Sequence, residues 1–237
     1  MATTINKQRV LNQVLATAPK SAGDGDAARP VLEQFIYAIC REGATREQAD
    51  RAFRLLQERF FDWNEVRVSS AQELKDAFAG LCGPDQRAQR LIAFLQEVFE
   101  TTFSFDLEGL QKKGLKQAAK QLGRYQAANE YAVSWVVQRT LGGHAIPLDA
   151  PTLRCARRVG LAEAGGDEAE ARASLEHLVP KAKGPAFTDQ ISHLAGTWCG
   201  EEEPNCPACP LAGECPTAQE NGALSVGAGR SHRPKPR

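Results

Sequence analysis

Four cysteines near the C-terminal end constrain this 237-residue chain more than any other feature. They follow the pattern C-x6-C-x2-C-x5-C and are Cys199, Cys206, Cys209 and Cys215. Four thiolates this close in sequence can surround one metal centre, and no histidine interrupts the run. An all-thiolate set of four holds either tetrahedral zinc or an iron–sulfur cluster. The run therefore predicts a metal site, and both kinds of centre stay open at this point.

The other cysteines favour a reducing compartment. Cys40, Cys82 and Cys155 lie far apart in the sequence and bring the total to seven. An odd number of scattered cysteines is typical of metal-site usage rather than of a disulfide framework. The chain also has no apolar run long enough to span a bilayer and no signal-peptide core. We therefore expect a soluble, cytoplasmic protein that makes no contact with membranes.

Helical periodicity recurs along the chain, whereas strand signals are almost absent. The apolar pattern predicts helices at 31–39, 52–60, 70–78, 84–99, 115–122, 131–141, 150–158 and 168–178. Residues 20–28 read as a linker, and the tail from residue 221, rich in glycine, serine, proline and basic residues, is expected to be disordered. The sequence therefore predicts an all-α protein.

The net charge is zero, but the basic residues are concentrated in one segment. Residues 110–158 carry nine basic side chains against two acidic ones. The basic residues are Lys112, Lys113, Lys116, Lys120, Arg124, Arg139, Arg154, Arg157 and Arg158. Such a segment indicates a surface that faces nucleic-acid phosphates, although a solvated helix face has the same composition.

The irregular cysteine spacing resembles the [4Fe-4S] loop of the endonuclease III family of helix-hairpin-helix DNA glycosylases. Leu148-Asp149-Ala150-Pro151 resembles the family's V-D-T-H segment, which carries the catalytic aspartate. Further upstream, 35–39 and Gly43-Ala44-Thr45 resemble the family's apolar helix and its A-Q-A-T turn. The resemblance implies a [4Fe-4S] cluster on the four cysteines, with zinc as the alternative, and double-stranded DNA as the partner.

The resemblance covers about residues 30–216 and implies two helical domains that flank a DNA cleft. The N-terminal segment, 1–28, is expected to pack with the cluster domain. Residues 29–148 would form a six-helix domain with a degenerate helix-hairpin-helix, and residues 149–220 the C-terminal helices and cluster loop. Residues 221–237 are expected to be a disordered basic tail.

The chain departs from the family at the lysine that forms a Schiff base in its bifunctional members. Counting back from Asp149 places Tyr131 there, and an alternative register places Tyr125 there. A phenol cannot form an imine, so lyase chemistry by this route is not expected. Lys116 resembles the lysine of the family's G-R-K-T-A, and it is the alternative candidate for a Schiff-base lysine, at a different position in the sequence. We predict Asp149 and Tyr131 as catalytic residues, although Asp149 also suits a helix N-cap and Tyr131 suits core packing.

The hairpin and its surroundings depart as well. The family's L-P-G-V-G becomes Tyr125 to Asn129, so Ala127, Ala128 and Asn129 are the predicted hairpin contacts with DNA phosphate. Asn129 can adopt a left-handed conformation, which alanine cannot do cheaply. Lys116, Arg154 and Arg157 are the further predicted DNA contacts.

Two more differences bear on base extrusion and on the cluster loop. Gly43 stands where many relatives carry a glutamine that fills the gap left by a flipped base, and Glu42 or Arg41 are the candidate substitutes. Three glutamates in 200–205 replace the basic residues that relatives carry in this loop, which favours a structural role for the cluster.

These features predict a monomeric, DNA-associated protein, most simply a monofunctional DNA N-glycosylase of the base-excision-repair type. The alternative is a non-catalytic iron–sulfur helix-hairpin-helix protein that binds DNA. A zinc-stabilised helical protein without a DNA role is the third possibility.

Overall fold

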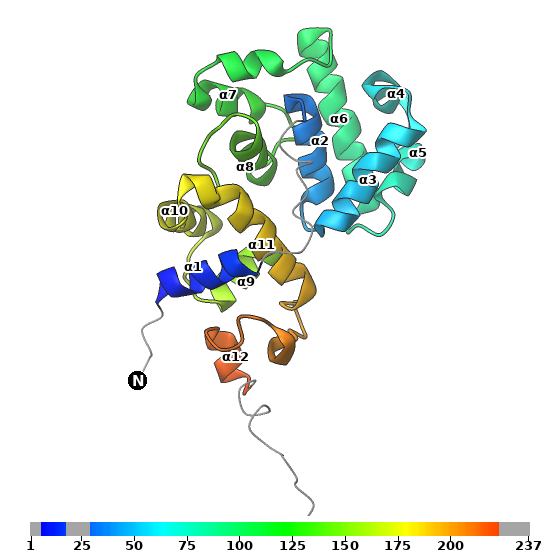
Figure 1. The fold of residues 1–237 in the computed structure, drawn as a ribbon. Helices are drawn as coiled ribbons and strands as arrows, with labels where there is room; N and C mark the ends of the chain where they lie inside the picture. The colour runs from blue at the N-terminus through cyan, green and yellow to red at the C-terminus, as the bar shows by residue number, and fades with distance from the viewer. Residues whose placement is uncertain (1–5, 18–28, 223–237) are drawn as a thin grey trace, which may run out of the picture.

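The computed structural model describes residues 6–17 and 29–222, and the secondary structure of this part of the chain is helical throughout, without strands (Figure 1). The predicted all-α fold is therefore confirmed. The predicted linker at 20–28 and all of the predicted tail beyond Gly222 lie outside the described residues. No helix in the described part is both long and apolar enough to cross a membrane.

The elements follow one another in a simple order along the chain. The α-helices are α1 (Lys7–Ala16), α2 (Val31–Arg41), α3 (Arg46–Arg59), α4 (Trp63–Val68), α5 (Ala71–Lys75), α6 (Pro84–Thr102), α7 (Leu115–Leu122), α8 (Glu130–Arg139), α9 (Ala150–Arg158), α10 (Glu168–Leu178), α11 (Gly184–Thr197) and α12 (Pro216–Glu220). Short 3-10 turns are η2 (Asp76–Phe78), η3 (Glu108–Lys112), η4 (Lys181–Lys183) and η5 (Cys206–Ala208).

Helix α2 lies at the centre of the first hydrophobic core, between α3 and α8 (Figure 1). All of its residues except Glu33 are buried. The Phe35 ring stacks on Phe94 of α6 with centroids 3.9 Å apart, and the Tyr37 hydroxyl donates to Asp50 of α3 at 2.6 Å. A helix that is apolar on every side belongs in an interior. This rigid centre fixes the turn after α2, which enters the candidate site.

The second hydrophobic core joins the two ends of the described chain. Val10, Leu11 and Val14 of α1 belong to the same core as residues of α9, α10, α11 and the cysteine loop. The first core uses residues up to Val136, and the rest of the second begins at Ile146. The domain boundaries predicted at 28, 148 and 220 nevertheless stay a prediction.

Among the helices of ten or more residues, α1 and α11 were not predicted from the sequence. Buried polar residues interrupt the apolar sequence pattern of helix α11, so the pattern does not identify it as a helix. These residues are Thr188, Gln190 and Ser192. Helix α1 is short, and half of its residues are polar. The helix predicted to run to residue 141 ends at Arg139, because the Gly143 N–H turns back to the Val137 carbonyl at 2.8 Å. A Cβ on Gly143 would lie 2.4 Å from Val137 Cγ1, so only glycine fits this close turn.

Candidate active-site cleft and cysteine loop

The predicted helix-hairpin-helix corresponds to α7, a tight connection and α8. The Ala128 N–H donates to the Tyr125 carbonyl at 2.9 Å, and Asn129 is the N-cap of α8, its side chain accepting from the Ala132 N–H at 2.9 Å. This capping requires an extended backbone, and Asn129 has φ −131° and ψ 173°. The left-handed conformation considered for Asn129 is therefore wrong: its side chain serves the helix instead.

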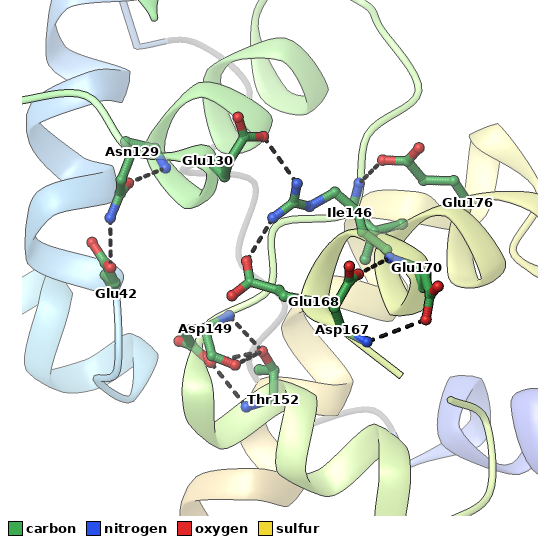
Figure 2. A network of polar contacts seen from close by, with 12 residues as sticks. Glu42, Asn129, Glu130, Ile146, Asp149, Thr152, Asp167, Glu168, Glu170 and Glu176 are labelled. Atoms are coloured by element: carbon green, nitrogen blue, oxygen red, sulfur yellow. Dashed lines mark hydrogen bonds and ion pairs between the residues drawn. The ribbon is translucent and has the colours of Figure 1, made fainter. Parts of the chain in front are cut away.

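Carboxylates hold the hairpin from two sides. Glu42, which follows α2, accepts from the Asn129 side chain at 2.7 Å and pairs with Arg90 of α6 (Figure 2 shows the Asn129 contact). Arg90 also donates to the Ala127 carbonyl at 2.7 Å. Glu97 of α6 accepts from the Gln126 N–H at 2.7 Å. Of the three predicted hairpin contacts only Asn129 is exposed, and carboxylates stand beside the surface that a phosphate would approach.

Asp149 is the N-cap of α9 and is 8% exposed. Its Oδ1 accepts from the Thr152 N–H at 2.9 Å and lies 2.6 Å from the Thr152 hydroxyl (Figure 2). Its Oδ2 accepts from the Gly43 N–H at 2.8 Å, a bond between residues 106 positions apart. The carboxylate is therefore fixed at both oxygens, as a helix cap and as a bridge to the turn after α2.

The Gly43 turn is built so that its backbone reaches Asp149. Gly43 has φ +65°, a conformation that glycine adopts without strain. The Arg87 guanidinium donates to the Ile39 and Glu42 carbonyls and braces the turn. Arg41 is 2% exposed and donates to the Ala44 carbonyl, so it cannot fill the gap left by a flipped base. The sequence marks Gly43 only as the position where relatives carry a glutamine. It gives no sign that the backbone N–H of Gly43 donates to Asp149.

A cleft of about 480 Å³ opens where Asp149 meets the Gly43 turn. Its lining comes from the turn after α2, the start of α6, α9, and Glu201 of the cysteine loop. The lining residues are Glu42, Gly43, Cys82, Gly83, Gln86, Arg87, Arg90, Asp149, Ala150, Pro151, Arg154 and Glu201. The lining therefore combines three carboxylates with three arginines, and Glu42 pairs with Arg90 while Glu201 lies 3.7 Å from Arg154.

Tyr131 lies in the first core rather than on the cleft wall. It is 4% exposed and stacks on Trp135 with ring centroids 6.1 Å apart. Burial raises the pKa of its phenol far above the ordinary value, Arg41 opposes this rise, and the charge of Asp149 adds to it. The phenol is therefore neutral and packed, and its predicted catalytic role stays a prediction.

The predicted basic contacts have different surroundings. Arg154 lines the cleft, donates to the Cys199 carbonyl at 3.3 Å and lies 3.7 Å from Glu201. Arg157 donates to the Gly166 carbonyl. Lys116 is exposed on α7 and does not line the cleft. Their contacts with DNA stay predictions.

The four loop cysteines line one small, almost wholly apolar pocket. Cys206 and Cys215 are buried, and Cys199 and Cys209 are half-buried. The Asn205 N–H donates to the Trp198 carbonyl at 2.7 Å and closes the loop. Within 6–17 and 29–222, no three histidine, cysteine, aspartate or glutamate side chains stand in metal-binding geometry. The thiols share a pocket without converging on a single point.

The chemistry of this pocket suits a thiolate-bound centre. A hydrogen bond from Cys155, aided by Arg158, outweighs burial and lowers the pKa of Cys199 to about 6. Burial raises the pKa of the Cys209 and Cys215 thiols. Because the thiolate is the ligand form, a metal that binds here must displace protons from these two. An all-thiolate donor set on an apolar pocket fits both a [4Fe-4S] cluster and zinc.

Comparisons with solved structures identify the fold. Endonuclease III in a non-covalent complex with DNA superposes with a TM-score of 0.70 at 16% identity, covering 92% of this chain and 99% of that one. A thermostable thymine-DNA glycosylase gives 0.63 at 16% identity, covering 90% and 97%. The chain therefore has the helix-hairpin-helix fold of these proteins.

The match to curated sequences is weaker than the match to solved structures. The DNA glycosylase/AP lyase ROS1 of Arabidopsis thaliana is 23% identical over 171 residues, which are 65% of this chain and 12% of that protein. The chain thus spans about an eighth of the length of this relative. No protein-family model matches.

Proposed function

Because the chain has the fold of endonuclease III, we propose that it binds duplex DNA and hydrolyses the N-glycosidic bond of a damaged or mismatched base. The observation that carries this proposal is Asp149, held on the wall of the cleft by Gly43 and Thr152. In this fold the cleft between the two helical units is the place where DNA would lie.

The contacts of Asp149 leave it one free acceptor position. An ionised carboxylate has about four lone-pair sites. Two on Oδ1 are used by the N–H and hydroxyl of Thr152, and one on Oδ2 by the Gly43 N–H. The remaining site on Oδ2 can accept from a water or stabilise the positive charge that develops on a sugar as its base leaves. A carboxylate held in this way needs no reorientation during the reaction.

We propose that the reaction stops at base removal. The phenol of Tyr131 cannot form an imine with the sugar, and it is buried beside Trp135. Lys116 is exposed on α7 and is not part of the cleft lining. The product would then be an intact strand with an abasic site, which breaks only on treatment with heat or alkali.

We further propose that Cys199, Cys206, Cys209 and Cys215 hold a [4Fe-4S] cluster, with zinc as the alternative. When bound, the cluster would cross-link the segment that follows α11 to the start of α12 and could exchange an electron. Arg158 already ties this loop down, since it donates to the Glu201 carbonyl at 2.7 Å. Glu201, Glu202 and Glu203 make the loop acidic, so it would repel phosphate and serve a structural purpose.

Release of a free base from a panel of lesion-containing and mismatched duplexes tests the proposal. Asp149→Asn should slow release by about 10²- to 10⁴-fold, the usual contribution of a positioned acid or base. The matched control is Asp167→Asn, because Asp167 caps α10 through the same kind of capping box but lies outside the cleft lining. Failure to find any substrate whose release depends on Asp149 would sink the enzymatic proposal.

The second candidate is a DNA-binding protein without base excision. Two observations favour it: Gly43 has no side chain to fill the gap of an extruded base, and Glu42 and Glu97 occupy hydrogen-bonding groups of the hairpin. Binding without base release in the same panel, equal in wild type and Asp149→Asn, would support this candidate over the enzyme.

A further inference from the structure

Every charged side chain that lines the cleft is already held by another group of the protein. The three arginines donate to backbone carbonyls, Arg90 also pairs with Glu42, and Glu201 lies 3.7 Å from Arg154. Asp149 is held at both of its oxygens. The charged part of the lining therefore maintains the shape of the cleft, and recognition of a base is left to the uncharged part.

Gln86 is the one long uncharged side chain in this lining. The other uncharged lining residues are Gly43, Cys82, Gly83, Ala150 and Pro151. Gln86 is exposed, and its amide makes no hydrogen bond with any residue of 6–17 or 29–222. A glutamine amide carries two donor hydrogens and two acceptor positions. All four are therefore available to a ligand in the cleft.

The start of α6 places Gln86 at the rim of the cleft. The Arg87 guanidinium donates to the Cys82 carbonyl at 2.8 Å and to the Glu42 carbonyl, so this end of the helix is fixed to the turn after α2. A Cβ added to Gly83 would lie 3.0 Å from Gln86 Oε1. The amide thus lies over the bare backbone of Gly83, on a support that is itself held in place.

Asp149 and Gln86 occupy different depths of the same cleft. Asp149 is 8% exposed, whereas Gln86 is an exposed residue. An enzyme that acts on a base of a duplex extrudes the nucleotide into its pocket, which leaves the opposite base without a partner in the stack. With the sugar of the extruded nucleotide at Asp149, the rim of the cleft faces the duplex and that unpaired base.

We propose that Gln86 is a specificity-determining residue whose amide hydrogen-bonds with the base left unpaired opposite the extruded nucleotide. The proposal deepens the proposed function and rests on its DNA-binding and base-extrusion part. A glutamine amide can donate and accept at once, as it does in a bidentate contact with adenine. Because the four bases present different donors and acceptors, the amide should favour some opposite bases over others.

Duplexes that carry a tetrahydrofuran analogue of an abasic site test this contact without any base to release. The analogue is placed opposite adenine, cytosine, guanine and thymine in turn, and fluorescence anisotropy gives the affinity of the full-length protein for each duplex. The affinities of the wild type for the best and the worst opposite base should differ by roughly 5- to 150-fold, the discrimination of a bidentate base contact. Gln86→Ala and Gln86→Leu should remove most of this spread, since leucine keeps the size of the side chain but not its amide.

Gln89→Ala is the matched control, because Gln89 is exposed on the same helix but does not line the cleft. It should leave the four affinities and their spread unchanged. Equal binding of the four duplexes by the wild type overturns the proposal, and so does a spread that survives in Gln86→Leu. A uniform loss of affinity in the Gln86 variants overturns it as well, because the side chain would then contact DNA without reading the opposite base.

This measurement separates the role of Gln86 from the enzymatic proposal. If no duplex releases a base in an Asp149-dependent manner, base excision fails, while a preference for the opposite base that depends on Gln86 can still be present. Conversely, Asp149-dependent release together with equal affinities for the four abasic duplexes would retain the enzyme and overturn the role of Gln86. A protein that binds none of the duplexes overturns both.

Discussion

Gly43 contributes a backbone N–H to the cleft, where a side chain was expected to matter. Gly43→Ala should cost about 1–2 kcal/mol of stability, because alanine is strained at φ +65°. It should also slow base release by roughly tenfold, since a shifted turn weakens the bond to Asp149, and tenfold corresponds to about 1.4 kcal/mol. Thermal unfolding and single-turnover base release measure the two effects.

Gly142→Ala is the control for Gly43→Ala, because it separates the effect of backbone strain from the loss of the bond to Asp149. Gly142 has φ +63°, and a Cβ there would meet nothing within 4 Å. The backbone strain should therefore match that of Gly43→Ala, while Asp149 is untouched. If the two variants lose stability and base release to the same extent, the Gly43 N–H has no specific role.

Tyr131 predicts a dependence of stability on alkaline pH. Because burial raises the pKa of the folded-state phenol above the unfolded value of about 10, its stabilisation is complete below pH 10 and is lost as the pH rises further. Tyr131→Phe cannot ionise, so its free energy of unfolding should fall less steeply above pH 10, by up to about 1.4 kcal/mol per pH unit. Urea unfolding at pH values from 8 to 11 measures this dependence. If Tyr131 were solvated, the free energy of unfolding would fall equally with pH in wild type and in Tyr131→Phe.

At the scale of elements, helix α6 places a carboxylate where the hairpin between α7 and α8 is predicted to contact DNA phosphate. Glu97 of α6 accepts from the Gln126 N–H, so a charge stands beside the predicted phosphate site. Glu97→Gln keeps an acceptor and removes the charge. DNA affinity should rise about two- to fivefold at low salt, for an interaction of roughly 0.5–1 kcal/mol, and the gain should fade as salt is added.

Glu100→Gln is the control for the hairpin, because Glu100 lies about one turn further along α6 and contacts Gln96 instead. Fluorescence anisotropy with a duplex at several salt concentrations would compare the variants. An equal gain from both substitutions would mean that overall charge, and not the hairpin, determines the affinity.

Local sequence patterns predicted the elements better than the contacts between them. Asp149 followed by Ala150 and Pro151 predicts a helix start, and α9 begins there. The bond from Gly43 to Asp149 joins residues 106 positions apart, and no local pattern reports it. The same holds for Cys155 and Cys199, which line one pocket only because α9 packs on α11.

Across the whole molecule, Asp189 of α11 connects the second core to the first. It accepts from Arg139 of α8 at 2.6 Å and lies 3.8 Å from Arg46 of α3. The Arg139 side chain is only 8% exposed, so this pair is little screened by water. Both arginines belong to the helices that frame the Gly43 turn and the hairpin, and the geometry of the cleft therefore depends on this junction.

Asp189→Ala should lower the free energy of unfolding by about 1.5–3 kcal/mol, the range for a hydrogen bond to a charged group. Glu163→Ala is the control, because it breaks the exposed pair with Lys7 and should change stability by no more than about 0.5 kcal/mol. Base release should fall in Asp189→Ala alone, since Gly43 and Asp149 approach each other from opposite sides of the junction. Urea unfolding and base-release assays compare the two variants. If Asp189→Ala matches Glu163→Ala in both, packing alone holds the two hydrophobic cores in place and Asp189 is not needed.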